Sequence, residues 1–400
     1  MRSVKVFGLD VLVAFILLLA LHTAQSKLCA ENWPGWRGPT GQGICRETNL
    51  PVTWSTTENV RWKTPLPDGG NSSPVVICID RTSGEILWQR DIAYKEPELT
   101  HGTNPLCSAT PVTDGERVIA HHGSAGLVCY DMEGKLLWTH EHEKLHHIWG
   151  NASSPILYHD LVIIWCGPGD RQFLLAVDRR TGKKVWDHFE PDGNSGESGK
   201  LLGTWATPII VRIGDEDQLI MPIPYKLRGF APATGRVLWT SDGVGHYVYG
   251  SAVYENGVVV CGNSMFKLGP KGVVEHQRLR NGTGKGPHTG VLAGGYLFKG
   301  GVAPARVELA TDEDVWKGQY KVRPGTTYTW GSMVHAGDKV YFTDQRGTTL
   351  VLASGPKYEV LALNKLGERT NASIAVSQGD ILIRTHKHLW CIGKVEEAVE

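Results

Sequence analysis

The chain has 400 residues, with 41 basic and 41 acidic side chains and a formal net charge of zero. This balance argues against a partner that is recognised by charge, such as nucleic acid or an anionic membrane surface. The 48 glycines and 14 tryptophans are typical of a turn-rich β protein anchored by aromatic rings. Because no Pro/Ser-rich linker divides the chain, we expect one large domain.

The first residues have the features of an export signal. Arg2 and Lys5 precede an apolar run at 11–21, and small residues of the kind that signal peptidase reads lie at 24–26. The run is short for a membrane span, so we expect cleavage after Ser26, with an uncleaved anchor as the alternative. The residues before Cys29 lack the small side chains of a lipobox, so we expect no lipid anchor. The predicted organisation is a signal peptide (1–26), an N-terminal extension (27–58), a propeller (59–394) and a C-terminal tail (395–400), in a periplasmic or extracellular protein without stable membrane insertion.

A repeated tryptophan, four positions after a turn glycine, divides the chain into similar units. It occurs at Trp88, Trp138, Trp186 and Trp239, after Gly84, Gly134, Gly182 and Gly235. A repeat of roughly 40 to 50 residues indicates a solenoid or a propeller. The runs between the turns are short and β-rich without a helical pattern, which favours the propeller. We expect each indole to pack against the neighbouring unit.

A second motif runs in phase with the tryptophans and counts the units. It occurs at Ser73-Pro74, Thr110-Pro111, Ser154-Pro155, Thr207-Pro208, Ala252-Val253, Gly290-Val291, Ser332-Met333 and Ser373-Ile374. Eight occurrences predict an all-β, eight-bladed β-propeller. The last unit lacks its final strand, so we expect residues 59–62 to pair with it and close the ring. Only five residues separate Pro74 from Asp80, which predicts a truncated first blade.

The stretch from Ala176 to Trp186 reads Ala-Val-Asp-Arg-Arg-Thr-Gly-Lys-Lys-Val-Trp. It resembles the tryptophan-docking signature of PQQ-type eight-bladed propellers. Segments 33–39, 370–376 and 384–390 resemble the exported PQQ-like repeat proteins of planctomycete-type bacteria, and the resemblance covers about residues 31 to 394. It implies the propeller fold without a single function. The family contains quinone-dependent dehydrogenases and also proteins that bind no cofactor, such as the propeller lipoprotein of the outer-membrane barrel assembly machinery.

The loops that enter the innermost strands of a propeller crowd one face of its central channel. In this chain they are rich in aromatic, imidazole and amide side chains, which suit a planar quinone or a sugar by stacking and edge hydrogen bonding. The candidate ligand-binding residues are His101, Asn104, His147, Trp149, Trp205, Tyr247, His288, Trp330 and Asn371, and the same loops contain Asn71, Asn151, Tyr249 and Tyr328. The alternative is that the aromatic residues only pack between blades.

The sequence offers weak grounds for a metal or cofactor. Histidines at 140, 142, 146 and 147 share a loop with charged residues, which is typical of a solvated turn, so we assign no metal site. The resemblance implies that a dehydrogenase would carry an adjacent Cys-Cys disulfide, a calcium held by acidic and amide ligands, and an Asp base. No two cysteines are adjacent here, and we assign no catalytic residue. PQQ with calcium is the one cofactor to test.

Eight cysteines in an exported chain raise the question of disulfides. Cys78, Cys129 and Cys391 fall at equivalent places in different units, so we expect buried free thiols there. Cys29 with Cys45 is the one pair to test for a disulfide.

Three functions are compatible with these observations. The favoured one is a non-catalytic exported propeller that binds a protein, peptide or glycan through the face at the channel mouth. The alternatives are a PQQ- and calcium-dependent oxidoreductase of alcohols or sugars, and a carbohydrate-active hydrolase or lyase.

Overall fold

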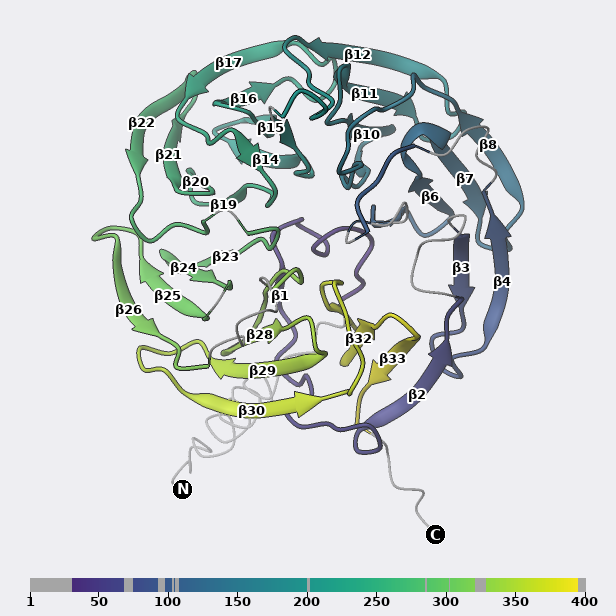
Figure 1. Ribbon diagram of the computed structural model, residues 1–400, viewed down its shortest axis with the longest axis vertical. Helices are drawn as coiled ribbons and strands as arrows, with labels where there is room; N and C mark the ends of the chain where they lie inside the picture. The colour runs from purple at the N-terminus through teal and green to yellow at the C-terminus, as the bar shows by residue number, and fades with distance from the viewer. Residues whose placement is uncertain are drawn as a thin grey trace, which may run out of the picture.

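The computed structural model describes residues 31–67, 75–92, 98–102, 104, 108–199, 202–284, 286–301, 303–320 and 329–394. Antiparallel sheets are arranged radially around a central axis, so that the chain forms a ring of blades (Figure 1). The predicted signal peptide, Cys29 and the C-terminal tail lie outside the described residues. Among those residues, no helix has the length and apolar character needed to cross a membrane.

Five blades are continuous in sequence, each with four strands in antiparallel succession. They are β5 (Val112–Thr113), β6 (Arg117–His121), β7 (Leu127–Asp131) and β8 (Leu136–His140); β9 (Ile156–Tyr158), β10 (Leu161–Cys166), β11 (Gln172–Asp178) and β12 (Lys184–Glu190); β14 (Ile209–Ile213), β15 (Glu216–Ile223), β16 (Lys226–Phe230) and β17 (Val237–Asp242); β19 (Val253–Glu255), β20 (Val258–Cys261), β21 (Ser264–Gly269) and β22 (Gly272–Arg278); and β23 (Val291–Ala293), β24 (Tyr296–Lys299), β25 (Ala305–Glu308) and β26 (Glu313–Lys317).

Two further blades recruit strands from the beginning of the chain. One consists of β27 (Val334–Ala336), β28 (Lys339–Thr343), β29 (Thr348–Ala353) and β30 (Val360–Lys365), with β1 (Ile44–Cys45) added in parallel beside β27. The other consists of β31 (Ala375–Ser377), β32 (Asp380–Arg384) and β33 (His388–Ile392), with β2 (Val60–Pro65) as its fourth strand. Because β2 pairs antiparallel with β33, the two ends of the propeller close the ring, as predicted.

The prediction of eight blades is wrong, because the described residues form seven four-stranded blades. Between β2 and β5 the chain forms only a two-stranded sheet, β3 (Val75–Ile79) and β4 (Ile86–Asp91). A strand rises about 3.3 Å per residue. The five residues between Pro74 and Asp80 are therefore enough for one strand, β3, but not for the two further strands of a complete blade. The motif count marked where units begin and could not show how many strands follow. The loops also contain a two-stranded sheet of β13 (Gly203–Thr204) and β18 (Tyr247–Val248), and the short 3-10 helix η1 (Gly123–Ala125).

The repeated tryptophans lie between neighbouring units. Trp138 Nε1 donates a 3.0 Å hydrogen bond to the carbonyl of Arg179 in the next unit. Its ring lies so close to Gly182 that a Cβ on this glycine would come within 2.6 Å of it. Trp186 repeats the arrangement with the carbonyl of Pro232, at 3.2 Å, and with Gly235. Trp138 and Trp186 therefore each join two blades by stacking and by one hydrogen bond, whereas the hydrogen bond of Trp239 goes to Gln218 in its own blade.

The degenerate units retain this contact in altered form. Gly272 lies against the ring of Trp239, although its own unit has no tryptophan. His276 follows it by four positions, as the repeated tryptophan follows its glycine, and stacks on Phe266 with ring centroids 4.6 Å apart. Where a further unit lacks its turn glycine, Asp312 adopts a positive φ of 56°. Side-chain replacements thus preserve the turn and the packing.

The N-terminal segment 31–58, purple in Figure 1, crosses the middle of the ring. It contacts the innermost strands of opposite blades: Thr113 N donates to the Pro34 carbonyl at 2.8 Å, and Tyr254 N donates to Gln42 Oε1 at 2.7 Å. The guanidinium of Arg37 is 3% exposed and donates to four backbone carbonyls, those of Gln42, Thr289, Gly290 and Met333. Burial lowers the pKa of Arg37 to about 9. The segment is therefore an integral part of the channel.

Candidate functional site

Hydroxyl side chains in the repeated small-polar motif, or directly before it at Ser251 and Thr289, form a hydrogen-bonded series around the axis. Each backbone N–H donates to the hydroxyl of the following unit. The bonds run from Thr110 to Ser154 (2.9 Å), Ser154 to Thr207 (3.0 Å), Thr207 to Ser251 (2.9 Å), Ser251 to Thr289 (3.0 Å), Thr289 to Ser332 (3.0 Å) and Ser332 to Ser373 (2.9 Å). This hydroxyl series holds the starts of the innermost strands in one register, and therefore fixes where the preceding loops emerge.

Several of the predicted site residues come together in one cluster of stacked rings, which we term the aromatic row. It consists of His147, Trp149, Trp205, Tyr249, Tyr247, His246 and Tyr225. Trp205 stacks on Tyr249 at 5.2 Å, and Tyr249 stacks on Tyr247 at 6.0 Å with an interplanar angle of 9°. The row runs from Trp205, 8% exposed, to Tyr225, 53% exposed.

Local pairing explains how the row assembles. Strands β13 and β18 pair in parallel, with Gly203 opposite Tyr247. Trp205 N then donates to the carbonyl of Val248 at 2.8 Å, and its indole Nε1 donates to the carbonyl of Gly150 at 2.8 Å. These bonds hold the Trp205 ring between two loops that are distant in sequence, so the aromatic row is rigid at its buried end.

His147 and Asn104 support the row. His147 is 1% exposed, lies edge-on to Trp205 at 5.0 Å, and accepts a 3.1 Å hydrogen bond from Trp149 N through Nδ1. Burial lowers the pKa of His147 to about 4, so the ring is neutral at physiological pH. Asn104 Nδ2 donates to the carbonyl of Trp149 at 2.6 Å. Both residues position Trp149, and His147 itself packs inside the protein.

A buried carboxyl group lies next to this region and was not singled out by the sequence. Glu98 is 7% exposed, and its oxygens accept hydrogen bonds from Asn151 Nδ2 at 2.7 Å and Ser124 Oγ at 2.6 Å. Burial raises the pKa of Glu98, and these hydrogen bonds act in the opposite direction. Both oxygens are thus occupied by protein donors. Asn151 belongs to the predicted loop and is the only sequence signal that leads to this acid.

The remaining candidate residues lie on other parts of the ring. His288, Trp330 and Asn371 precede β23, β27 and β31, whereas the aromatic row is built from loops between β8 and β19. His288 is only 2% exposed, and Asn371 accepts a 2.8 Å hydrogen bond from Gln345 Nε2. His101 is exposed. Asn71 and Tyr328 lie outside the described residues. Ring contacts therefore join His147, Trp149, Trp205 and Tyr247 of the nine candidates, and one site formed by all nine stays a prediction.

The four histidines at the end of β8 and in the β8–β9 loop contact different partners. His140 Nδ1 contacts the carbonyl of Gly182 at 2.8 Å, and His146 lies 3.1 Å from Glu197. His147 joins the aromatic row, and His142 packs against His121. The described histidines of this loop therefore do not converge on one point.

The cysteines follow the expectation where the structure describes them. Cys129 and Cys391 are buried free thiols, and Cys78 is a half-buried free thiol. Cys45 is buried, and because Cys29 lies outside the described residues, a disulfide between them stays a prediction to test.

The residues present do not fit the quinone and calcium set of the dehydrogenases. The sequence has no adjacent cysteines, and both oxygens of Glu98 already accept hydrogen bonds from Asn151 and Ser124. Within the described ranges, the one group of His, Cys, Asp and Glu side chains suited to a metal is His121, His142 and Cys166, whose donor set contains no carboxylate. We therefore assign no step of a quinone-dependent oxidation to this site.

Comparison with known proteins supports the repeat assignment. Residues 72–243 match the family model described as outer membrane protein assembly factor BamB. This segment carries PQQ-like propeller repeats. No curated protein matches the chain significantly. The narrower resemblance to planctomycete-type exported proteins stays a prediction.

Solved structures show the same fold at low sequence identity. BamB from Moraxella catarrhalis is 14% identical, with a TM-score of 0.55 over 82% of this chain and 96% of its own. Quinohemoprotein alcohol dehydrogenase from Comamonas testosteroni is 14% identical, with a TM-score of 0.62 over 91% of this chain and 81% of its own. A europium-containing methanol dehydrogenase is 12% identical, with a TM-score of 0.61 over 88% and 89%. At such identities, the PQQ-like fold is common to proteins of different activity.

Proposed function

We propose that this PQQ-like propeller is an exported, non-catalytic binding protein that takes up a protein, peptide or glycan partner through the face that carries the aromatic row. The observation that supports this function best is the row itself. Trp149, Tyr247 and Tyr249 are half-buried, so each ring is held by packing while part of it stays accessible.

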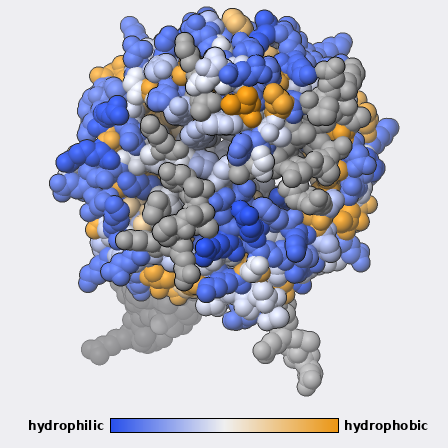
Figure 2. Space-filling view, in the orientation of Figure 1, coloured by the Kyte–Doolittle hydropathy of each residue, from blue (hydrophilic) through white to orange (hydrophobic). Residues whose placement is uncertain are grey.

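Rigid aromatic rings suit this task. The hydrogen bonds of Trp205 with Val248 and Gly150 fix the buried end of the row before a partner arrives, so little conformational entropy is lost there on binding. Tyrosine and tryptophan offer flat apolar faces to a sugar ring or a proline, and polar edges to backbone groups. The face seen in Figure 2 is mostly hydrophilic, with hydrophobic residues in small groups. A partner of the row would combine ring stacking with hydrogen bonds to the polar edges of the tyrosines and tryptophans.

The family match is compatible with a binding role. The matched model is described as an assembly factor, and the propeller of Moraxella catarrhalis BamB has the same fold. A partner of this chain would be a protein in that case, and the aromatic row leaves a peptide or glycan as the alternative. Export rests on the N-terminal signal features, which predict a mature chain in the periplasm or outside the cell.

Tryptophan fluorescence can test the binding role, because Trp149 and Trp205 belong to the row. The mature chain would be titrated with soluble oligosaccharides and with a proline-rich peptide library. Trp149→Ala and Tyr247→Ala should weaken binding at least tenfold, in line with the loss of an aromatic anchor. Phe189→Ala is a matched control, since Phe189 is 50% exposed on β12, outside the row. A ligand that binds all four proteins equally would contradict this site.

The oxidoreductase alternative has its own test. PQQ and calcium would be added to the same protein while thermal stability and dye-linked oxidation of alcohols and aldoses are followed. A ligand that binds only the folded state must raise the melting temperature. A raised melting temperature with turnover would replace the proposed function, and the lack of both would remove the alternative.

A further inference from the structure

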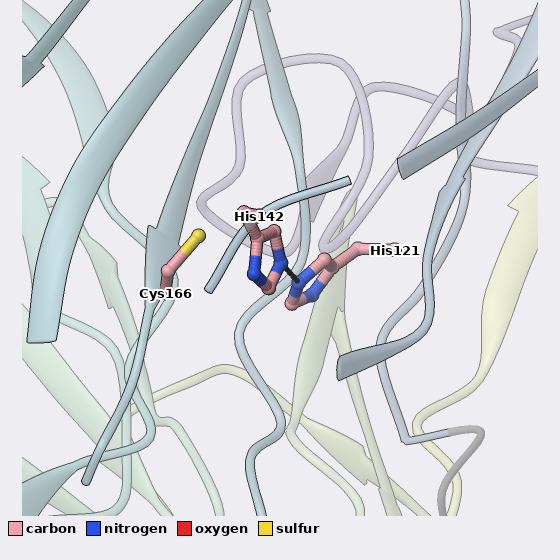
Figure 3. A group of neighbouring side chains, drawn as sticks. All are labelled: His121, His142 and Cys166. Atoms are coloured by element: carbon pink, nitrogen blue, oxygen red, sulfur yellow. Dashed lines mark hydrogen bonds between the residues drawn. The ribbon is translucent and has the colours of Figure 1, made fainter. Parts of the chain in front are cut away.

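A cluster of two histidines and a cysteine lies between two blades, outside the aromatic row. His121 is the last residue of β6, and Cys166 is the last residue of β10 in the neighbouring blade. His142 comes from the loop after β8 and lies between the other two, with the Cys166 sulfur pointing toward it (Figure 3). The donor atoms of the three residues all lie within 4.8 Å of one another. Three separate segments thus bring their donors to one point.

The cluster is well shielded from solvent. His121 is 1% exposed, Cys166 is fully buried, and His142 is half-buried. The ring of Phe173 covers His142 edge-on at 5.9 Å. Burial lowers the pKa of both histidines and raises the pKa of the Cys166 thiol. A cation would bind the two imidazoles through their lone pairs and would have to displace the proton of the thiol.

The hydrogen bonds orient the imidazoles for a shared cation. His142 Nδ1 lies 2.8 Å from the carbonyl of Glu143, which can only accept, so Nδ1 carries the proton and Nε2 carries the lone pair. That Nε2 lies 3.1 Å from Nε2 of His121. A carbonyl bond to the remote ring nitrogen is the usual support of a metal-bound histidine. Without a cation, His121 must instead donate its own proton to His142.

We infer that His121, His142 and Cys166 form a binding site for a borderline transition-metal dication of the zinc and copper kind. Imidazole nitrogen and thiolate sulfur are the ligands that these ions prefer, whereas calcium and magnesium require oxygen donors, which this set lacks. Binding replaces the S–H bond of Cys166 by a metal–sulfur bond and releases the proton to solvent. The cation joins β6 to β10, and so links two blades next to the sector that holds only the β3–β4 sheet.

This site differs from the metal site that the sequence argued against. The histidine-rich loop contributes only His142, because His140 and His146 turn to Gly182 and Glu197. The other two ligands lie 21 positions before and 24 positions after His142 in the sequence, on strands of different blades. The inference does not depend on the proposed binding function.

Metal binding by the full mature chain tests the inference. The chelator-treated protein would be dialysed against Zn²⁺, Cu²⁺ or Ca²⁺, and the bound metal measured by mass spectrometry. One Zn²⁺ or one Cu²⁺ per chain is expected, without Ca²⁺. Zn²⁺ should raise the melting temperature, and Co²⁺ or Cu²⁺ should produce a thiolate charge-transfer absorption band. Comparison of the Zn²⁺ and Cu²⁺ affinities shows which of the two ions the site prefers.

Substitutions assign the ligands. Cys166→Ala should abolish the absorption band and weaken metal binding by more than about 100-fold, because even partners behind the ligands change affinity by 10- to 100-fold. His142→Asn should weaken binding similarly, and since His142 is half-buried this variant should still fold. Cys261→Ala is the matched control, because Cys261 is buried at the same end of the second strand of another blade.

Three results would count against the inference. One is that the wild-type chain takes up no Zn²⁺ or Cu²⁺ although its circular dichroism spectrum shows that it is folded. Alternatively, Cys166→Ala and His142→Asn could keep wild-type metal affinity, which would place the ion elsewhere. Loss of binding in Cys261→Ala as well would point to general destabilisation and would equally count against these ligands.

Discussion

The backbone N–H of Ser154 donates a 3.0 Å hydrogen bond to Thr207 Oγ1, across 53 positions of sequence and from one blade to the next. Ser154 is 2% exposed and Thr207 is 3% exposed, so water cannot replace the bond easily. The same contact recurs around the axis in the hydroxyl series. In the sequence, the small-polar motif marks only where an innermost strand begins. In the structure, it also forms a contact between blades.

Removing the Thr207 hydroxyl should destabilise the protein. Thr207→Val keeps the shape of the side chain but leaves the buried N–H of Ser154 without an acceptor, which costs about 1 to 3 kcal/mol. Thr207→Ser keeps the hydroxyl and should lose much less. Urea unfolding of both variants measures the difference, and equal stabilities would show that the hydroxyl series is not a stabilising contact.

Two features of the structure require glycine at position 182, the turn residue that packs against Trp138. Gly182 has a φ of +69°, and a Cβ there would lie 2.6 Å from the indole. Gly214 has a similar φ of +60°, but a Cβ there would meet nothing within 4 Å. Gly214→Ala should therefore cost only the roughly 1 to 2 kcal/mol of a left-handed alanine. Gly182→Ala should cost about 1 to 3 kcal/mol more, because the ring must move. Equal melting temperatures would contradict the stacking contact.

The indole of Trp186 should contribute to stability without contributing to binding. Trp186 is 8% exposed, and its Nε1 donates a hydrogen bond to the carbonyl of Pro232, which does not belong to the aromatic row. Trp186→Ala should cost about 3 to 5 kcal/mol, as for other large-to-small core substitutions. The adjacent Val185 is 53% exposed, so Val185→Ala should change little. Ligand affinity measured on the folded fraction should match the wild type for both variants.

Acid should destabilise the protein through its buried histidines. Burial lowers the pKa of His288 from its ordinary value of 6.5 to about 4. The unfolded chain therefore takes up a proton near pH 6.5 that the folded chain refuses until about pH 4, and stability is lost as the pH falls through this range. A shift of this size corresponds to about 3 kcal/mol.

His288→Gln removes this one titration. Its free energy of unfolding should fall less steeply than that of the wild type between about pH 7 and about pH 4.5. A residual slope is expected, because burial also lowers the pKa values of His122 and His147 to about 4. Denaturant unfolding at several pH values measures the slope. Parallel profiles would show that His288 titrates normally.

Periodic features could be predicted from the sequence because each one depends on a few neighbouring residues. The turn before Trp186 depends only on Asp178, Gly182 and the two strands that the turn connects. Ring closure by residues 59–62 followed from counting an orphan strand at each end. The number of blades could not be obtained this way, since a unit start at Ser73 says nothing about how many strands follow.

The candidate site was predictable in part, for the same reason. Of the aromatic residues that the sequence places in the loops before the innermost strands, Trp149, Trp205 and Tyr247 meet in the row. His288 and Asn371 occupy the same repeat position in other blades. The backbone of His288 lies beside Gly250, next to the row, whereas its side chain is buried.

The sequence by itself determined the repeat, its turn glycines and tryptophans, and the joining of the chain ends, all of which follow from local chemistry repeated at a fixed spacing. Only the tertiary structure decided that β13 pairs with β18 and thereby places Trp205 on Tyr249. It also decided that His121, His142 and Cys166 share one point between two blades. Such contacts depend on how twisted sheets meet in space, and no short-range pattern records that geometry.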